Sequence, residues 1–594
     1  MLNQVNLEAV YILKTLILFV ISGILAIWLG FFAFDNITML EYYKNYVFWF
    51  LTINIILWVI SILKVYSSGS NNAKESIDKF KVFIHSHKIA ILMSFILMAA
   101  SVNFCKPEFR IFADEINLLS DSQNLYEAQE CYTTHSVLEY SNGGKIILAA
   151  VLDKRPALFP YLISIIHFLT GYRPENAFII NFLTGFLSLI LVYYLIQLFW
   201  GKYWGISGIL CLASYPLFIR YTNSGGFEVF NLLCSLIFFV CLYKFIKSPD
   251  ALRAEVLLLF VPLLSQSRYE SVLALFIALP LVFFVLPRKE YANLGYSFII
   301  FPLLLVAPAW LRLITSNAES WQVDSLEGGF GINWLFVNIK KALEFYFSGK
   351  SIYGINYILS YLALIGFVLF VYKLASNKPI YRENTVNKDK EFFSYKTFWL
   401  SVFAFYLLHA LVRFIYSWID LTNPIINRLG IIFLPFLVIM SVYLLFEISK
   451  KLNYCKYSIF IILLIPYFSG CWSYINIKDS QPYLDFYSCK SLLEKSFPDK
   501  NQYILIHYKP NLYTPFGYNS VGYNYYNKPE INKLVKEFYS QNQSKFYLAF
   551  QMVDLKTKST YFPIPDDLDY ENIFETIIDN AYILRVSKCV PQQK

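Results

Sequence analysis

The chain has 594 residues, of which 57% are hydrophobic, 19% aromatic and only 15% charged, with a formal net charge of +9 at pH 7. Soluble domains carry roughly 25% charged residues, so this deficit predicts a protein embedded in lipid and argues against a soluble enzyme. The Lys and Arg residues lie mainly in short loops between apolar runs, whereas a nucleic-acid-binding protein gathers them on one polar surface. We therefore expect the lipid bilayer as a partner and no nucleic acid.

Apolar runs long enough to cross a membrane recur along the chain. A hydrocarbon core of about 30 Å requires roughly 20 apolar helical residues. Runs that meet or approach this length lie at residues 10–33, 46–66, 88–105, 178–200, 203–219, 227–246, 294–314, 352–373, 396–416, 428–447 and 457–475. The first is interpreted as a retained span, because the N-terminus lacks a basic region and a small-residue cleavage site.

Residues 254–286 fit either one long span or two short spans that fold back at 265–271, and the choice inverts the topology of everything downstream. With two spans, loops 373–396 and 448–456 are cytoplasmic and hold nine Lys and Arg residues, against four in the opposing loops 315–351 and 417–428. Because cytoplasmic loops are enriched in Lys and Arg, two spans are favoured, giving about thirteen in total with the N-terminus inside. The predicted fold is a polytopic α-helical membrane protein.

This topology places loop 106–177, the Gly-rich turn 221–226 and everything after residue 475 on the outer face of the membrane. A bacterial inner membrane, with the periplasm outside, is the favoured location. The opposite, cytoplasmic side would carry a group of basic residues, namely Lys74, Lys79, Lys81, Lys88, Lys244, Lys247, Arg253, Arg288 and Lys289.

Three parts are expected: two additional N-terminal spans with a basic cytoplasmic loop at 1–87, a catalytic core at 88–475, and an extracytoplasmic α/β domain at 476–594. In the last part, strands are predicted at 502–507, 545–552 and 582–586, and helices at 530–539 and 571–577. Cys489 and Cys589 flank this domain and form either a disulfide, if the outer face is oxidising, or two buried thiols. The nine cysteines contain no CxxC pair and no Cys/His metal spacing, so no zinc or redox motif is predicted.

The outer loop contains the first candidate catalytic residues, Asp114 and Glu115, directly after the apolar run at 88–105. Ionisable groups beside a span are costly and are often functional. A partly desolvated carboxylate has a raised pKa and can act as a general base toward a hydroxyl acceptor. The alternative is an acidic pair at a helix N-terminus or two solvated loop carboxylates, and the residues alone do not separate Asp114 from Glu115.

The same loop contains Lys154 and Arg155, followed by a proline and a short apolar segment at 155–171 that is too short to span and fits an interfacial or re-entrant helix. The two cations could hold the phosphate of a lipid-phosphate donor and stabilise the charge that grows on it as a leaving group. The alternative is that they only extend toward lipid headgroups.

Further charged residues are expected at the same outer face. Glu228 follows a Gly-Gly turn, Arg268 and Glu270 lie at the tip of the predicted hairpin, and Arg428 opens a late span. Each alone is more often a headgroup-contacting or capping residue, but their convergence on one face favours a binding site. His135 and His167 have no second ligand at metal spacing and are interpreted as a polar loop residue and an interfacial residue.

Residues 88 to 475 resemble the GT-C glycosyltransferases, and in particular the family-39-like group of protein O-mannosyltransferases and aminoarabinose transferases. The resemblance lies in four features, of which the first is the Asp-Glu pair of the first large outer loop. The second is KRPALFPY at 154–161, which is similar to the group's K/R-P-P-L-Y stretch, and the third is SYP at 214–216 with GFE at 226–228. The fourth is NRL at 427–429 with Pro435, which is similar to R-Y-x-x-P. Ala157 stands in place of the second proline and Leu429 in place of the tyrosine. The chain also differs from the group in having two additional spans and a tail without the sugar-binding repeat of eukaryotic members. These differences bear on which substrate is used more than on the reaction class.

The resemblance implies transfer of a sugar from a polyprenyl-phosphate donor to a hydroxyl on a glycolipid, polysaccharide or protein, with inversion at the anomeric carbon. By this comparison Asp114 is the general base and Glu115 orients the acceptor or sugar. Lys154, Arg155 and Arg428 bind the donor phosphate. Glu228, Arg268 and Glu270 are the candidate substrate-binding residues. Members of the group differ in metal dependence, so a divalent metal stays open, although the sequence shows no dedicated metal site and no other cofactor is expected.

Two other classes of function compete with this interpretation. A transporter or flippase of lipid-linked sugars would carry charges within its spans and often inverted repeats, whereas here the charges gather at the outer ends of spans and no repeat is visible. An O-antigen ligase or polymerase also works on the outer face but uses a diphosphate-linked donor.

Overall fold

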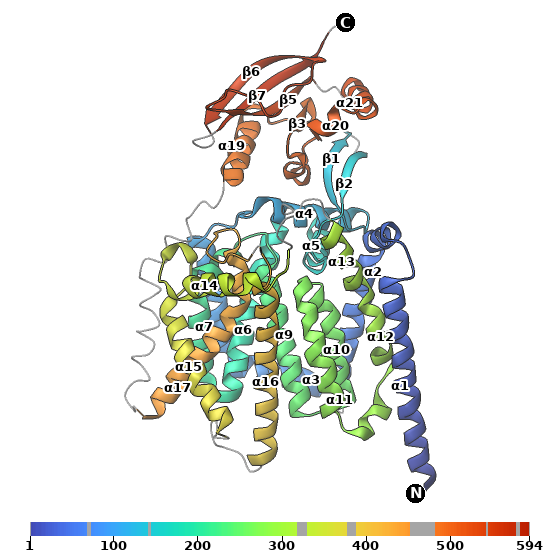
Figure 1. The fold of residues 1–594 in the computed structure, drawn as a ribbon, viewed down its shortest axis with the longest axis vertical. Helices are drawn as coiled ribbons and strands as arrows, with labels where there is room; N and C mark the ends of the chain where they lie inside the picture. The colour runs from blue at the N-terminus through green and yellow to red at the C-terminus, as the bar shows by residue number, and fades with distance from the viewer. Residues whose placement is uncertain are drawn as a thin grey trace. The chain divides into compact units, whose positions relative to one another are not determined.

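The computed structural model describes residues 2–67, 73–140, 144–317, 329–376, 388–417, 419–451, 481–541, 545–577 and 582–592. The chain forms two compact units. We call Met1–Glu108, Lys154–Phe159 and Phe178–Ile477 the helical unit, and Phe109–Asp153, Pro160–Ala177 and Lys478–Lys594 the sheet unit. Each is described by itself, and the labels follow Figure 1.

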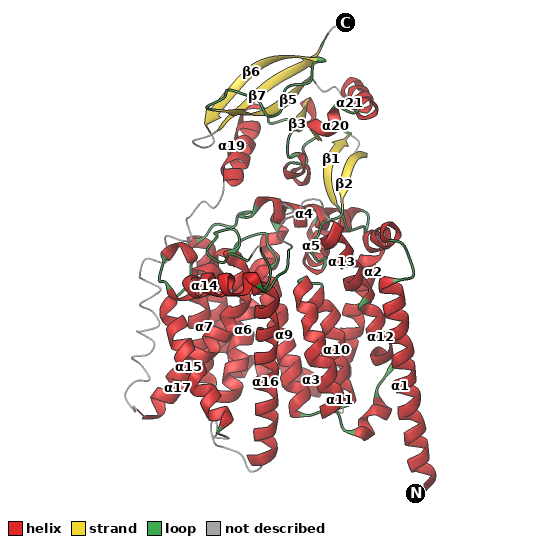
Figure 2. Cartoon of the chain, in the orientation of Figure 1, coloured by secondary structure: helices red, strands yellow, loops and turns green. Residues whose placement is uncertain are grey.

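The helical unit is a bundle of apolar helices, drawn in red in Figure 2. Its α-helices are α1 (Leu2–Phe31), α2 (Asn36–Ser67), α3 (Ala73–Phe104), α6 (Asn176–Trp200), α7 (Lys202–Ala213), α8 (Pro216–Thr222), α9 (Glu228–Lys247), α10 (Ala251–Ser265), α11 (Leu275–Val285), α12 (Tyr296–Leu304), α13 (Val306–Asn317), α14 (Asn333–Phe347), α15 (Tyr357–Ala375), α16 (Lys388–Phe414) and α17 (Leu434–Lys451). Short 3₁₀ helices η1 (Tyr269–Ala274), η2 (Arg288–Asn293), η4 (Ser351–Tyr353) and η5 (Asn427–Phe433) connect some of them.

Within the described residues, eight helices are long and apolar enough to cross a membrane: Val10–Phe31, Asn36–Ser67, Ile84–Phe104, Asn176–Trp200, Glu228–Lys247, Tyr357–Ala375, Phe393–Phe414 and Asn427–Lys450. This is the polytopic helical architecture that the apolar runs predict. The count of about thirteen spans stays a prediction from loop charge, and the expected span at 457–475 lies outside the described residues.

Several predicted spans are interrupted. The run at 203–219 is divided into α7 and α8 just before Pro216, which occupies the first position of α8. The run at 294–314 is divided into α12 and α13. The segment 254–286 turns between Ser265 and Tyr269, inside the stretch where the fold-back was expected. Residues 315–351, expected as an outer loop, include α14, which runs across the neighbouring helices in Figure 1.

Burial distinguishes the centre of the bundle from its rim. Most side chains of α9 are buried, so this helix lies at the centre of the unit. In contrast, α1 and α15 expose large apolar side chains such as Ile24 and Val368, as expected of helices that face lipid. α15 packs closely on α17 because Gly366 lacks a Cβ, which would collide with the carbonyl oxygen of Met440.

The sheet unit is built on a seven-stranded sheet in the order β2-β1-β4-β3-β5-β7-β6. The strands are β1 (Thr133–Glu139), β2 (Lys145–Val151), β3 (Tyr503–His507), β4 (Ser520–Gly522), β5 (Phe546–Asp554), β6 (Leu568–Ile577) and β7 (Tyr582–Pro591). β3 pairs in parallel with β4 and β5, and the other pairs are antiparallel. The helices are α4 (Phe112–Glu127), most of α5 (Leu158–Thr170), α19 (Gln481–Ser496), α20 (Tyr523–Tyr526) and α21 (Pro529–Gln541), with short 3₁₀ turns η7 (Lys500–Gln502), η8 (Pro510–Leu512) and η9 (Thr514–Phe516).

The core of the sheet unit forms where the central strands meet α21. All five residues of β3 are buried, which explains why this strand is a continuous apolar run. From α21, Val535 and Phe538 are buried in the same cluster as Ile504 and Ile506 of β3. The strands predicted at 502–507, 545–552 and 582–586 and the helix predicted at 530–539 correspond to β3, β5, β7 and α21.

The helix predicted at 571–577 is wrong, because these residues belong to strand β6. β6 is an edge strand that pairs antiparallel with β7, and Arg585 Nε contacts Glu575 Oε1 across the pair at 2.5 Å. Its aromatic and β-branched residues favour an extended backbone, and pairing with β7 stabilises this conformation. Cys489 and Cys589 are both buried thiols and form no disulfide, which is the second of the two alternatives.

The outer loop is more structured than the sequence predicts. Strands β1 and β2, from a loop assigned to the core by sequence, extend the sheet of the C-terminal segment, since Val137 of β1 pairs with Ser520 of β4. Asn519 reinforces this junction by accepting a hydrogen bond from the Glu139 backbone N–H at 2.5 Å.

Candidate functional site

Five charged side chains form a continuous chain of contacts inside the helical unit. Glu228 Oε1 lies 3.0 Å from Arg428 Nη1 and 3.9 Å from Arg268 Nη1. Arg268 Nε donates to Glu270 Oε1 at 2.5 Å, and the same oxygen accepts from Arg413 Nη2 at 2.7 Å. The order Arg428–Glu228–Arg268–Glu270–Arg413 therefore alternates in charge, and we call it the ion-pair chain.

Four separate elements bring the ion-pair chain together. Glu228 is the first residue of α9, where the helix dipole favours a carboxylate, and Arg413 is in the last turn of α16, where it favours a cation. Arg268 and Glu270 come from the turn between α10 and α11, and Arg428 comes from η5. Arg413 Nη1 also donates to the Leu429 carbonyl oxygen, which links α16 to the residue after Arg428.

A neutral polar network holds the turn that carries Arg268 and Glu270. Asn231, buried on α9, accepts hydrogen bonds through Oδ1 from the hydroxyls of Ser267 and Ser271, both at 2.9 Å. These two serines flank Arg268 and Glu270 in sequence. The positions of the charged side chains are thus set by hydrogen bonds to the central helix as well as by their own ion pairs.

The ion-pair chain is well removed from water, and this has an energetic consequence. The side chains of Glu228, Arg268, Glu270 and Arg413 are at most 7% exposed, and that of Arg428 is 11% exposed. Removing one partner of such a buried pair typically costs about 3–5 kcal/mol, whereas apolar residues of similar volume often replace a whole pair without loss. Because arginine stays charged even when buried, three arginines around two carboxylates can contact the anionic oxygens of a phosphate.

The segment with Lys154 and Arg155 lies beside this turn within the helical unit. The Ala157 N–H donates to Gln266 Oε1 at 3.3 Å, and the Leu158 N–H donates to the Gln266 carbonyl oxygen at 3.1 Å. Gln266 precedes Arg268 by two residues. Arg155 itself is buried. The structure thus joins, through Gln266, two stretches that the sequence analysis singled out more than one hundred residues apart.

Asp114 and Glu115 lie in the first turn of α4, in the sheet unit. Asp114 is half-buried, whereas Glu115 is buried and accepts a hydrogen bond through Oε2 from the Arg110 backbone N–H at 2.8 Å. A carboxylate in this position stabilises the start of a helix. The helix-terminus interpretation therefore fits Glu115, and the half-exposed Asp114 carboxylate is the one with more access to solvent or substrate.

The sequence analysis missed Arg413 and His409, which lie one helical turn apart on the same face of α16. His409 is buried, its ring packs on Phe405 with centroids 4.1 Å apart, and its Nδ1 bonds the Phe405 carbonyl oxygen at 2.9 Å. Both residues interrupt the apolar run at 396–416. An ionisable residue inside a span is by default a candidate functional residue, and this signal was available in the sequence.

His167, which the sequence analysis interprets as an interfacial residue, is fully buried and has a structural role. His167 is buried in the sheet unit, with Nδ1 2.7 Å from the Asn176 amide nitrogen and Nε2 3.2 Å from the Ser122 hydroxyl. Over the described part of the chain, no three His, Cys, Asp or Glu side chains gather in a way that could hold a metal ion.

Part of the chain matches a known family. Residues 154–311 match the family model of dolichyl-phosphate-mannose-protein mannosyltransferases. The matched segment includes Lys154, Arg155, Glu228, Arg268 and Glu270, that is, the loop segment and three members of the ion-pair chain. Among curated proteins, none matches the chain.

Two solved structures are similar to the chain at low identity. ArnT from Cupriavidus metallidurans bound to undecaprenyl phosphate is 10% identical, with a TM-score of 0.44, over 85% of this chain and 98% of that one. The archaeal oligosaccharyltransferase AglB from Archaeoglobus fulgidus, in complex with an inhibitory peptide and a dolichol-phosphate, is 12% identical, with a TM-score of 0.45, over 85% of this chain and 76% of that one. The match over residues 154–311 confirms the resemblance to the GT-C, family-39-like group predicted from sequence.

Proposed function

We propose, from the family that residues 154–311 match, that this protein is a membrane-embedded glycosyltransferase. It would transfer a hexose or pentose from a polyprenyl-phosphate donor to a hydroxyl group of a glycolipid, polysaccharide or protein. The ion-pair chain is the observation that carries this proposal. Its three arginines contact two glutamates of the matched segment, and arginine is well suited to bind a phosphate.

In the proposed reaction, the acceptor oxygen attacks the anomeric carbon of the donor sugar while the bond from that carbon to the phosphate oxygen breaks. The phosphate leaves with the electron pair as polyprenyl phosphate, and the anomeric configuration inverts. The acceptor proton passes to the Asp114 carboxylate, the proposed general base. Lys154, Arg155 and Arg428 contact the phosphate and stabilise the charge that develops on it.

The remaining charged residues have positioning roles in this proposal. Glu228 holds Arg428 and Arg268 through one carboxylate oxygen, and Glu270 holds Arg268 and Arg413 through another. Preorganised cations need no reorganisation when charge develops on the leaving group, which is the main source of electrostatic stabilisation. Glu115 supports Asp114 by fixing the start of α4 through Arg110.

The proposed location of this enzyme is a bacterial inner membrane, and the loop charges favour the extracytoplasmic side for the sheet unit. The donor phosphate and the acceptor hydroxyl would then meet at the outer face. No residue is assigned to a metal ion in this mechanism.

The test uses the full-length protein in lipid nanodiscs, supplied with radiolabelled polyprenyl-phosphate sugars and candidate acceptors. Wild-type protein should transfer label to an acceptor, and Asp114→Asn should lose about 10²–10⁴-fold, the usual contribution of a general base. Asp566→Asn, an exposed aspartate of the same unit, is the matched control and should keep full activity. Equal turnover in Asp114→Asn and wild-type protein would remove Asp114 as the base.

A further inference from the structure

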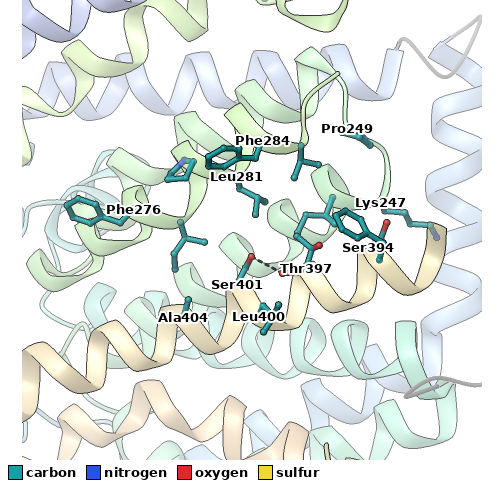
Figure 3. Close-up of a pocket in the computed structure, with 15 residues that line it drawn as sticks. Lys247, Pro249, Phe276, Leu281, Phe284, Ser394, Thr397, Leu400, Ser401 and Ala404 are labelled. Atoms are coloured by element: carbon teal, nitrogen blue, oxygen red, sulfur yellow. Dashed lines mark hydrogen bonds between the residues drawn. The ribbon is translucent and has the colours of Figure 1, made fainter. Parts of the chain in front are cut away.

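A second site lies in the helical unit, in a groove of about 960 Å³ between α11 and α16 that also contacts the end of α9 (Figure 3). Its volume is at the upper end of the roughly 300–1,000 Å³ typical of ligand pockets. Most of the residues that line the groove are apolar. Several of these are strongly exposed, including Phe284 at 88% and Phe276 at 68%. The groove is therefore open along its side.

The groove has a polar end and an apolar end. Lys247 and Ser394 lie together at one end in Figure 3, and Phe276 and Ala404 lie at the other. Between them, the Ser401 hydroxyl donates to the Thr397 carbonyl oxygen of its own helix at 2.9 Å, so it adds little polarity to the wall. A ligand that fits this gradient has a charged group at one end and a hydrocarbon chain behind it.

Lys247 is the cation at the polar end, and its position separates this groove from the ion-pair chain. Lys247 is the last residue of α9 and Glu228 is the first. At 1.5 Å per residue, the 20 residues of α9 place the two about 30 Å apart. A phosphate bound at Lys247 therefore cannot be the phosphate that reacts beside Glu228.

The surroundings of the groove point to a membrane lipid as its ligand. Its walls are α11 and the apolar part of α16, and the candidate span Phe393–Phe414 includes all of the α16 lining residues. Open apolar walls within a span face hydrocarbon chains. Lys247 and the neighbouring Lys244 are both exposed at the end of α9 that the loop charges assign to the cytoplasmic side, where anionic lipids gather basic residues.

We propose that this groove binds one hydrocarbon chain of an anionic phospholipid, with the lipid phosphate at Lys247. The chain lies along α11 and α16 between Phe284 and Ala404. This lipid is neither donor nor acceptor of the sugar. It occupies the opposite end of α9 and would stabilise the contact between α11 and α16, the helices that lead to Glu270 and Arg413.

The test measures lipid binding to the full-length protein in detergent by native mass spectrometry, with phosphatidylglycerol, phosphatidylcholine and undecaprenyl phosphate as probes. One phosphatidylglycerol should bind about fivefold more tightly than phosphatidylcholine, the factor expected for one lysine at an anionic headgroup. Lys247→Gln should remove this preference, while Lys244→Gln, a matched lysine that does not line the groove, should retain it.

A second variant tests the apolar part of the groove. Ala404→Trp should weaken binding of both phospholipids, and Ser401→Leu, which fills less volume, provides the same readout if the tryptophan variant does not elute as a monodisperse protein. Equal affinity for the two phospholipids in wild-type protein, or an unchanged preference in Lys247→Gln, would overturn the proposal. So would displacement of phosphatidylglycerol by one equivalent of undecaprenyl phosphate, because the groove would then belong to the donor.

Discussion

Two cores of the molecule bury polar groups of different kinds. The core of the sheet unit around β3, β5 and α21 contains neutral groups, such as His507 and the phenols of Tyr523 and Tyr547, packed among apolar side chains. The interior of the helical unit contains the ion-pair chain, with ionised side chains from α9, α16, η5 and the turn after α10. Buried ion pairs add little stability compared with well-packed apolar residues. The contrast indicates that the core around β3 and α21 is organised by packing, and that the helical unit retains charges for another reason, which is donor binding in the proposed function.

The largest effect on stability is expected from Glu270→Gln, which removes one carboxylate from the ion-pair chain. Losing this carboxylate leaves Arg268 and Arg413 without their shared acidic partner, so unfolding in denaturant should be easier by about 3–5 kcal/mol. Transfer activity should fall as well. The control is Glu344→Gln, which breaks the exposed pair with Lys350 and should change neither quantity. A neutral result for Glu270→Gln would mean that the ion-pair chain is not a coupled structure.

In the sheet unit, Phe538→Ala should have a similar effect on stability without an effect on chemistry. It removes a fully buried ring from the core cluster, and such substitutions cost about 3–5 kcal/mol. Hydrogen exchange in β3 and β5 should accelerate, while kcat per folded molecule stays unchanged. A loss of kcat in the folded fraction would contradict the assignment of this interior to packing alone.

Arg428→Gln, unlike Phe538→Ala, is expected to lower kcat. Removing one preorganised donor to a developing negative charge typically reduces kcat by about 10²–10³-fold. Arg428→Lys should recover part of this loss because it restores the charge without the planar fork of donors. Arg253→Gln, which breaks the more exposed pair with Asp250 on α10, is the control and should leave transfer unchanged. An Arg428→Gln enzyme with wild-type kcat would remove this arginine from the phosphate site.

The smallest effect is a change of stability with pH, which arises from His507 in the core of the sheet unit around β3. Burial, with the nearby Lys509 charge, lowers the pKa of His507 to about 3. The unfolded chain has a histidine pKa of about 6.5, so between these values it binds a proton that the native state does not. The contribution of His507 to stability should therefore be constant above about pH 6.5 and decrease as the pH falls toward 3.

Hydrogen exchange in β3 at pH 7 and pH 5, corrected for the intrinsic exchange rate, measures this change. His507→Phe keeps the ring contacts with Tyr508 and Phe550 but loses the bond from the Lys509 N–H, so it should be less stable overall and less sensitive to pH. An equal pH dependence in His507→Phe and wild-type protein would assign the effect to other groups.

The sequence predicts the helical unit better than the sheet unit. Spans are local features of composition, so the apolar runs correctly predict a polytopic bundle, and the polar stretch at 265–271 correctly predicts a turn. The structure also brings Glu228, Arg268, Glu270 and Arg428 into one network, the convergence expected from charges at the ends of predicted spans. The roles assigned to these residues, and to Asp114, Glu115, Lys154 and Arg155, stay predictions.

The misses arise where strands pair with one another. Residues 571–577 belong to strand β6 because β7 provides its pairing partner, and β1 joins β4 across more than 350 residues of sequence. Arg413 was overlooked because a single arginine changes the hydropathy of a 21-residue run very little. Its role appears only when η1 and η5 provide Glu270 and the Leu429 carbonyl oxygen.

The central claim is that a sugar leaves a polyprenyl monophosphate and is transferred to a hydroxyl. Its most direct test is a mass-spectrometric measurement of the lipid product formed by the purified protein, alongside the glycosylated acceptor. The account predicts one polyprenyl phosphate released for each acceptor hydroxyl glycosylated, with neither product formed when the other substrate is omitted. Release of a polyprenyl diphosphate, or passage of the intact donor across the membrane without glycosylation, would contradict it in favour of a ligase or a flippase.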